Sequence, residues 1–444
     1  MKGRLGQTHR TRMTSPARPS SRVPPWPALG LPAHRASSAT LAAAYPFLVP
    51  GPLDAGVPIG VDALSGSVFC FDPWTAYRAG ELTNPNAVLA GVVGAGKSAL
   101  AKSLAFRSIA AGRRVYVPGD PKGEWSTLAH AVGGVVIDLG PGCPTRLNPL
   151  DSSTPGPDGH GDRLRRLSVI AATTLHRDLR PHEHSALDAA VETAERAPTP
   201  TVAAVVAALT RPDPRAARRD AISEGDRAND GRDLAHGLRR LVHGDLAGMF
   251  DGPTTQSLDL AAPIIVLDLS RIGADDDALA VAMTCTSGWL DSALSGSASA
   301  HRWVIYDEAW RLLRHLAVVR RLQAQWKLAR AAGIANLLIV HRLSDLDAVG
   351  SVGSEARTLA EGLLADCSTR IVYRQEADQL PATGAALGLT GPERDLLPSL
   401  PRGTGLWKLP RRTHVVHHLL HPTEAALVDT DQAMHDELPA GPVH

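Results

Sequence analysis

Short apolar runs alternate with helix-like stretches along most of this chain. In order, the runs are AVLAG (87–91), RRVYV (113–117), GGVVIDL (133–139), PIIVLDL (263–269), RWVIYDE (302–308) and ANLLIV (335–340). Between the first two runs, apolar residues at helical spacing predict a helix over 97–111 that ends at Gly112. Apolar strands that alternate with helices form parallel sheets covered on both faces. We therefore predict an α/β fold with a mostly parallel sheet covered by helices.

The middle of the chain has a different pattern. No strand-like run appears in residues 151–262, where DRLRRLSVIAATTLH and TVAAVVAALT have helical periodicity and a charged break spans 211–232. We predict a mainly helical insertion at 151–262. It would separate the first part of the sheet domain, 45–150, from the second part, 263–425.

Both ends of the chain differ in composition from the middle. Up to about residue 40 the chain contains prolines, serines and seven Lys or Arg, and no acidic residue precedes Asp54. Such a segment buries too little apolar surface to fold alone. We predict a disordered, basic, Pro-rich tail at 1–44 and a flexible tail at 426–444. A start codon assigned upstream of Met13, or a tail that contacts DNA or anionic lipid, are the alternatives for the first segment.

Composition excludes several classes of protein. The formal net charge of +1 gives no global sign of nucleic-acid binding, although a local basic patch is left open. The four cysteines form no CxxC pair, so their spacing predicts neither a zinc site nor a disulfide framework. No apolar run approaches the roughly 18 residues of a membrane-spanning helix, and no secretory signal follows the basic start. We therefore expect a cytoplasmic protein.

A phosphate-binding motif follows the first apolar run. Residues 91–98, GVVGAGKS, fit the pattern GxxxxGK[ST] in full, with a strand before and a helix after. Glycines let backbone N–H groups surround phosphate oxygens at a helix N-terminus. In such loops the lysine contacts the β- and γ-phosphates and the hydroxyl ligates Mg²⁺. We predict that ATP binds here, contacted by Gly91, Gly94, Ala95, Gly96, Lys97, Ser98 and Ala99, with Ser98 a ligand of Mg²⁺.

This motif needs acidic partners on a neighbouring strand. WVIYDEAW (303–310) supplies four apolar residues followed by Asp307 and Glu308. We predict that Asp307 holds Mg²⁺ through water and that Glu308 polarises the attacking water. IIVLDLS (264–270) is a rival, but Asp268 has no acid after it, which is more typical of a residue packed at a strand end.

Taken in order, the motifs resemble the ATPases of type IV secretion and conjugal transfer systems, within the HerA–FtsK class of ring motors. The matching stretches are IGVDALSGSVFCFDPW, the phosphate-binding motif, GDPKGEWSTLAHAVGGVVIDLGPGCPTRLNPLD, GMFDG, DEAWRLL and STRIVYRQE. The resemblance covers about residues 45–425. It implies a RecA-like P-loop NTPase fold, a ring of six copies, and work with secretion-channel and coupling proteins near the inner face of the cell membrane. DNA as a direct partner stays open.

The family strand that resembles STRIVYRQE carries an arginine finger. Strand alternation places Arg370 and Arg374 on one face, and Arg374 lies at the carboxyl end, where the nucleotide binds. We expect Arg374 to be the finger, with Arg370 as second choice and a structural salt bridge as the alternative for both. Where relatives carry a glutamine, this chain has His341, which can hydrogen-bond a γ-phosphate or water.

Full-length relatives also have a large N-terminal domain. ASSATLAAAYPFLVPG (36–51) resembles its last fragment, so the chain is expected to lack most of it, as a short form or a truncated reading frame. The best reading is an ATP-hydrolysing motor of a conjugal DNA-transfer apparatus. Two alternatives remain: a translocase that acts directly on duplex DNA, and a truncated scaffold that binds ATP without hydrolysing it.

Acidic and histidine residues elsewhere have simpler explanations. Asp120 and Glu124, just beyond a predicted strand, are either contacts of the nucleotide or of a neighbouring subunit, or turn acids paired with Arg or Lys. His182 and His184 are two positions apart and would point to different faces of a helix, which disfavours a metal site. HVVHHLLH (414–421) has the pattern of a surface strand rather than of a metal site.

Three tryptophans near the second half of the predicted sheet could stack on bases. They flank predicted buried elements, so packing in the core or between subunits is the better interpretation. These residues are Trp303, Trp310 and Trp326.

Overall fold

The computed structural model describes residues 53–151, 157–256, 259–273, 275–294, 301–329, 332–341 and 354–428. The predicted tail at 1–44 lies outside these residues, and the tail at 426–444 is described only as far as Val428. No helix in the described part of the chain is long and apolar enough to cross a membrane.

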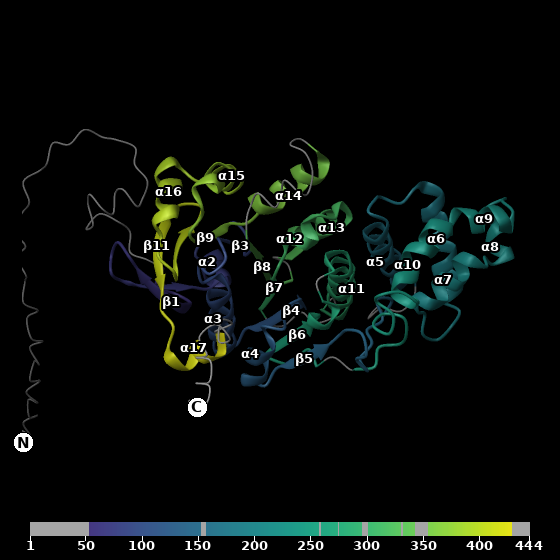
Figure 1. The fold of residues 1–444 in the computed structure, drawn as a ribbon, viewed down its shortest axis with the longest axis horizontal. Helices are drawn as coiled ribbons and strands as arrows, with labels where there is room; N and C mark the ends of the chain where they lie inside the picture. Colours follow the sequence, from purple (N-terminus) through teal and green to yellow (C-terminus); the bar gives the residue numbers. More distant parts are fainter. Residues whose placement is uncertain are drawn as a thin grey trace, which may run out of the picture. The chain divides into compact units, whose positions relative to one another are not determined.

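An 11-stranded sheet organises the described chain (Figure 1). Its strand order is β2-β1-β11-β10-β9-β3-β8-β7-β4-β6-β5. The strands are β1 Val57–Asp62, β2 Val68–Phe71, β3 Ala87–Ala90, β4 Arg114–Asp120, β5 Val135–Asp138, β6 Ile264–Asp268, β7 Arg302–Tyr306, β8 Ile334–Val340, β9 Thr369–Val372, β10 Thr404–Lys408 and β11 Thr413–His418.

The sheet has a parallel and an antiparallel part. The strands from β9 to β5 in this order are parallel to their neighbours, whereas β10, β11, β1 and β2 pair antiparallel. The six apolar runs of the sequence are β3 to β8, so the predicted mostly parallel sheet is confirmed. The antiparallel extension was not predicted as part of this sheet.

Both faces of the sheet are covered, because alternate residues of each strand point to opposite faces. Val88 and Ala90 of β3 belong to one buried cluster, and Ala87 and Leu89 belong to the other. The helices are α2 Pro73–Arg78, α3 Lys97–Ala110, α4 Ser126–Ala131, α5 Pro157–Leu175, α6 Pro181–Ala194, α7 Val202–Thr210, α8 Pro214–Arg219, α9 Glu224–Asp230, α10 Arg232–Val242, α11 Asp276–Leu294, α12 Trp310–Leu313, α13 Leu316–Ala329, α14 Glu355–Ala365, α15 Leu380–Ala386, α16 Gly391–Leu396 and α17 Pro422–Val428.

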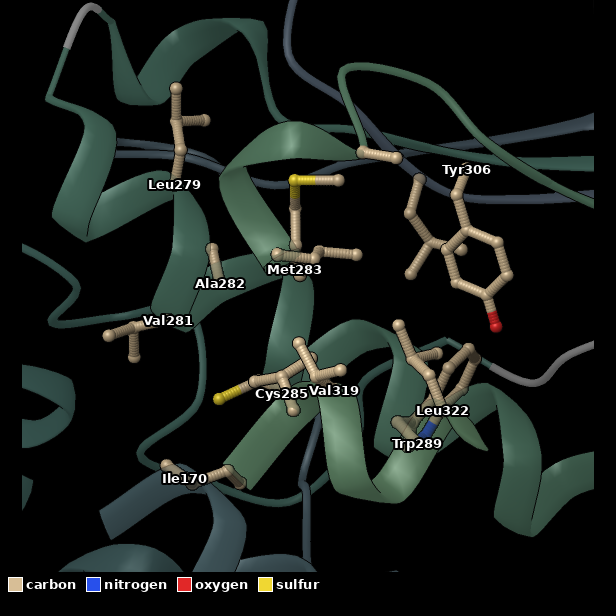
Figure 2. Packing of buried hydrophobic residues seen from close by; sticks show 14 of the residues in the cluster. Ile170, Leu279, Val281, Ala282, Met283, Cys285, Trp289, Tyr306, Val319 and Leu322 are labelled. Carbon is tan, nitrogen blue, oxygen red and sulfur yellow. The ribbon is translucent and has the colours of Figure 1, made fainter. Parts of the chain in front are cut away.

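Helix α11 joins the sheet to the helices of the middle segment. It contacts β4 on one side and α5 and α12 on others. Figure 2 shows this packing, in which the side chains of α11 meet those of β7, α13 and α5. The labelled residues are Ile170, Leu279, Val281, Ala282, Met283, Cys285, Trp289, Tyr306, Val319 and Leu322.

Between β5 and β6 the described residues form helices α5 to α10, drawn in teal in Figure 1. Two short helices, α8 and α9, occupy most of 211–232, so the expected charged break is wrong. Asp213 and Ser223 cap them, and such side-chain caps let short charged segments form helices.

Candidate nucleotide site

The predicted site residues lie at one edge of the sheet, where five neighbouring parallel strands end. In sheet order these strands are β9, β3, β8, β7 and β4. Arg374 follows β9, the phosphate-binding loop at 91–98 follows β3, His341 follows β8, Asp307 follows β7, and Asp120 ends β4. Ligands of parallel α/β sheets bind at this carboxyl edge. The fold therefore brings together residues from five separate stretches of sequence.

The three glycines of the phosphate-binding loop are required for two physical reasons, backbone conformation and lack of space. Gly94 and Gly96 have φ angles of 76° and 104°, a region that side chains disfavour. A Cβ atom on Gly91 would lie 2.6 Å from the Cβ of Tyr373, so no larger residue fits. The loop leads into α3, whose first residue is Lys97, and leaves N–H groups of the helix N-terminus free for an anion.

Lys97 is held inside this loop. Its side chain is buried, and its Nζ donates a hydrogen bond to the carbonyl of Val92 at 2.9 Å. Burial lowers the pKa of Lys97 to about 8, although the carboxylates of Asp307 and Glu308 act in the opposite direction. An ammonium bonded to a loop carbonyl can exchange that carbonyl for a phosphate oxygen. Ser98 and Ala99, half-buried, follow in the first turn of α3.

Asp307 is buried and its carboxylate is fixed from two sides. Oδ1 accepts the backbone N–H of Glu308 at 2.9 Å, and Oδ2 accepts the indole N–H of Trp125 at 3.0 Å. A carboxylate and a hydroxyl are oxygen ligands of the kind that Mg²⁺ prefers. Asp307 and Ser98 therefore fit the predicted metal, and the loop fits the phosphates.

Glu308 lies at the centre of a cluster of donors. Its carboxylate contacts Lys122 Nζ at 2.5 Å, His341 Nε2 at 2.9 Å and Trp310 Nε1 at 2.7 Å. Burial raises the pKa of Glu308, but the hydrogen bonds from His341 and Lys122 outweigh burial and lower the pKa to about 2. Its φ angle of 51° is unusual for a residue with a side chain, and such conformations gather at functional sites.

His341 contacts the predicted base directly. Its Nε2 lies against Glu308, while Nδ1 is buried and has no hydrogen-bond partner among the described residues. Residues 342–346, the rest of the motif in which relatives carry their glutamine, lie outside the described residues. His341 is thus a direct hydrogen-bond neighbour of the predicted base.

Arg374 is joined to the phosphate-binding loop through its backbone. Its carbonyl accepts the N–H of Val92 at 3.0 Å, and its side chain is exposed. Arg370, the second choice for the finger, has its side chain engaged in hydrogen bonds to the backbone. Its guanidinium donates to the carbonyls of Cys367, Leu387 and Ala365.

Asp120 lies under the next loop and organises it. Its carboxylate accepts the backbone N–H groups of Lys122 at 3.2 Å and Trp125 at 2.8 Å. Burial raises the pKa of Asp120 to about 7, the bond from Trp125 opposes this, and the carboxylates of Asp307 and Asp268 add to the rise. This geometry makes Asp120 part of the frame of the site.

Glu124 and Asp268 have local partners. Glu124 pairs with Lys102 of α3 at 3.2 Å, which favours the interpretation as a turn acid paired with lysine. Asp268 accepts the hydroxyl of Ser126 at 3.1 Å and the N–H of Ser270 at 2.8 Å, as expected for a residue packed at a strand end.

Sequence reasoning did not assign four residues that the structure places at the site. The signal for the two lysines was available, because the chain has only six lysines, of which Lys102 follows the phosphate-binding motif and Lys122 lies in the GDPKGEW stretch. The aromatic neighbours had no such signal, since their role depends on which carboxylate their N–H reaches. These residues are Lys102, Lys122, Trp125 and Trp310.

Of the histidine and tryptophan candidates, His341 and Trp310 lie at the site, and the others lie elsewhere. No group of three or more possible metal ligands occurs among the described residues. The strand predicted in HVVHHLLH is β11, but it lies inside the sheet, so the expectation of a surface strand is wrong: His414 and His418 are buried. Trp303 and Trp326 are buried in the core, as expected from their flanking elements.

Comparisons with known proteins give structural relatives. No family model matches the sequence, and no curated protein matches it. VirB4 of Thermoanaerobacter pseudethanolicus superposes with a TM-score of 0.68 at 24% identity, covering 84% of this chain and 100% of that chain. The bacterial conjugative coupling protein TrwB gives a TM-score of 0.59 at 15% identity, covering 87% of this chain and 92% of that chain. TrwB in complex with ADP and Mg²⁺ superposes with a TM-score of 0.58 at 15% identity, covering 87% of this chain and 93% of that chain.

At these sequence identities the comparisons establish the fold alone. They agree with the architecture described above, a large and mostly parallel sheet with a phosphate-binding loop after β3. The protein therefore has the P-loop NTPase fold of VirB4 and TrwB, as its sequence motifs predict.

Proposed function

We propose that this chain is the Mg²⁺-dependent ATPase motor of a conjugal DNA-transfer or type IV secretion apparatus. One observation carries the proposal: Lys97 of the phosphate-binding loop lies within electrostatic range of Asp307 and Glu308 at one edge of a sheet with the fold of VirB4 and TrwB. TrwB is described as a conjugative plasmid coupling protein, and one of its structures contains ADP and Mg²⁺.

Phosphate binding begins at the loop. The N–H groups of the first turn of α3 bind the phosphate oxygens, and Lys97 turns from the carbonyl of Val92 to the β- and γ-phosphates. Ser98 and Asp307 would hold Mg²⁺, Asp307 through a water molecule. Bound Mg²⁺ neutralises charge that develops between the β- and γ-phosphates.

Hydrolysis requires Glu308 to receive a proton from water. Its carboxylate accepts hydrogen bonds from Lys122, His341 and Trp310. Three donors leave about one of its four lone-pair sites for the water proton, so release of one donor would free a second site and make Glu308 a stronger proton acceptor. His341 then remains beside the reacting water and the γ-phosphate.

Assembly completes the site in this proposal. The chain would form a ring of six in which the exposed side chain of Arg374 reaches the nucleotide of the neighbouring copy. The ring would work on the cytoplasmic side of the membrane with the channel and coupling proteins. The presence of Lys97, Asp307 and Glu308 in one site favours hydrolysis over a non-hydrolysing scaffold.

The test is ATP hydrolysis by the purified protein and by Glu308→Gln. Glu308→Gln should keep ADP affinity and lose hydrolysis by a factor of about 10²–10⁴, since Asp307 and Lys97 are spared and the base is removed. Glu393→Gln is the matched control, because Glu393 is also buried and paired with a lysine, Lys408, at 2.6 Å.

Glu393→Gln should hydrolyse ATP like the wild type. Full hydrolysis by Glu308→Gln would show that Glu308 is not the base. Absence of Mg²⁺-dependent hydrolysis in the wild type would contradict the proposed activity itself.

A further inference from the structure

The loop formed by residues 120–125 connects β4 to α4 and contacts both candidate acids. Lys122 reaches Glu308, and Trp125 reaches Asp307. Glu124 pairs with Lys102, whose side chain is 1% exposed and which lies on the helix that begins at the phosphate-binding loop. The 120–125 loop is therefore tied to the P-loop helix and to the carboxylates at once.

Within this loop Trp125 is the most constrained residue. Its side chain is fully buried, at 0% exposure. Its backbone N–H donates to Asp120 Oδ2 at 2.8 Å, and its indole N–H donates to Asp307 Oδ2 at 3.0 Å. Asp120 thus holds the backbone of Trp125, and the ring of Trp125 holds the carboxylate of Asp307.

The orientation of Asp307 is consequently determined at both oxygens. The backbone N–H of Glu308 holds Oδ1 at 2.9 Å, and the indole of Trp125 holds Oδ2. An ionised carboxylate has about four lone-pair sites, so about two remain for a metal-bound water. Without the indole, the backbone N–H of Glu308 would still hold Oδ1, but Oδ2 would lose the bond that fixes it.

Core packing alone does not account for this contact. The N–H of a buried tryptophan usually has a hydrogen-bond partner, and a backbone carbonyl or a hydroxyl can serve as well as a carboxylate. Trp303 illustrates this, because it is equally buried and its indole donates to the hydroxyl of Ser108 at 3.2 Å. The partner of Trp125 is instead the residue that the motif predicts as a metal ligand.

We propose that Trp125 is a positioning residue: its indole N–H holds the Asp307 carboxylate in the orientation that receives Mg²⁺. The proposal rests on the function proposed above. Outer-shell partners of metal ligands typically contribute a factor of 10–100 in metal affinity. Trp125 would act on the metal through Asp307, without touching the metal or the nucleotide.

The experiment measures ADP affinity in the presence and absence of Mg²⁺ for the wild type, Trp125→Phe and Trp303→Phe. Both variants keep an aromatic ring in the core and lose one indole N–H. They differ in the acceptor that this N–H had, which is the carboxylate of Asp307 for Trp125 and the hydroxyl of Ser108 for Trp303. Trp125→Phe should need about tenfold more Mg²⁺ to reach the Mg²⁺-dependent gain in ADP affinity. Its ADP affinity without Mg²⁺ should equal that of the wild type, and Trp303→Phe should match the wild type in both measurements.

The outcomes separate the two proposals. If the wild type binds ADP more tightly with Mg²⁺ and Trp125→Phe behaves like Trp303→Phe, the positioning role is overturned and the proposed function stands. If the wild type binds no ADP, the proposed function fails and the positioning role with it.

Should a thermal melt show that Trp125→Phe does not fold, Asp120→Asn replaces it. Asp120→Asn removes one acceptor from the backbone of the loop and should raise the Mg²⁺ requirement in the same direction, and an unchanged requirement would overturn the role.

Discussion

At the scale of single residues, the contacts of Glu308 hold the predicted base in a poor state for catalysis. A carboxylate with a pKa of about 2 is a weak acceptor for the proton of water. The three donors that surround Glu308 also keep it ionised although it is buried. Lys122 is the most accessible of them, with 49% of its side chain exposed, so it can leave most easily.

Lys122→Met tests this arrangement. Burial raises the pKa of Glu308 and the hydrogen bonds from His341 and Lys122 lower it to about 2 from the usual 4.5, so loss of Lys122 should move it upward. Because the base must be ionised, the acid limb of the pH–rate profile should shift to higher pH. The measurement is kcat/KM for ATP hydrolysis across the acidic range, because kcat/KM reports the pKa values of the free enzyme. Lys408→Met, which removes the partner of Glu393, is the control.

The pH dependence of folding stability should shift in the same direction as the acid limb of the pH–rate profile. A carboxyl whose pKa is depressed in the folded protein stabilises it above the unfolded pKa, and this contribution is lost as the pH falls through the folded pKa. For the wild type that window lies between 4.5 and about 2. In Lys122→Met the contribution should be smaller and should be lost at higher pH. Identical acid limbs in Lys122→Met and Lys408→Met would contradict the assigned contact.

At the scale of elements, the phosphate-binding loop is supported by the antiparallel part of the sheet. The N–H of Gly403, just before β10, donates to the carbonyl of Ala95 at 2.9 Å. A Cβ atom on Gly96 would lie 3.3 Å from that same nitrogen. The loop is therefore shaped both by its own glycines and by the start of a distant strand.

Gly96→Ala should damage this element in a specific way. Gly96 has a φ of 104° and a close neighbour, whereas Gly112, at the other end of α3, has a φ of 78° and nothing within 4 Å of its Cβ position. Both alanine variants should lose about 1–3 kcal/mol of stability from backbone strain. Only Gly96→Ala should also weaken ADP binding, by about tenfold or more, since each backbone bond to a charged group contributes about 1.5–3 kcal/mol.

Thermal melts and ADP titrations of the two variants provide the comparison. Equal ADP affinities for Gly96→Ala, Gly112→Ala and the wild type would argue against phosphate binding by this loop.

At the scale of the whole molecule, we propose that a second copy of the chain completes the site. The backbone of Arg374 is bonded to its own phosphate-binding loop, while its side chain is exposed. A planar guanidinium suits bidentate contact with phosphate. This arrangement is consistent with an arginine finger that acts on the neighbouring nucleotide in a ring.

Mixing two inactive variants tests this assembly. Arg374→Ala should bind ATP but hydrolyse it more slowly by a factor on the order of 10³ or more. Lys97→Ala should lose ATP binding or turnover and stay folded in a thermal melt. Mixed rings of the two should regain part of the activity, because some interfaces would join an intact loop to an intact finger.

Mass measurement must confirm that the mixed rings form. Mixed rings no more active than their two parts would exclude a finger that acts in trans. Substantial hydrolysis by Lys97→Ala alone would instead remove the basis for the phosphate site.

Much of the molecule could be predicted from local sequence. Six apolar runs became β3 to β8, and the helix expected at 97–111 is α3, Lys97–Ala110. These elements were predictable because periodicity and glycine positions act over a few neighbouring residues. The antiparallel strands and the burial of β11 were not, since pairing across the sheet joins β10 to β9 and β1 to β11 over long stretches of chain.

The sequence by itself determined the P-loop NTPase fold and the residues that its motifs contain, from Gly91 to Ser98 and at Asp307 and Glu308. The chemistry of these motifs lies in contiguous residues, which is why it could be read without a structure. Only the tertiary structure decided which side chains surround them: Lys122 and His341 on Glu308, and Trp125 on Asp307. Such contacts depend on which strands are neighbours in the sheet, and the order β8, β7, β4 is set by packing of the whole core rather than by any local pattern.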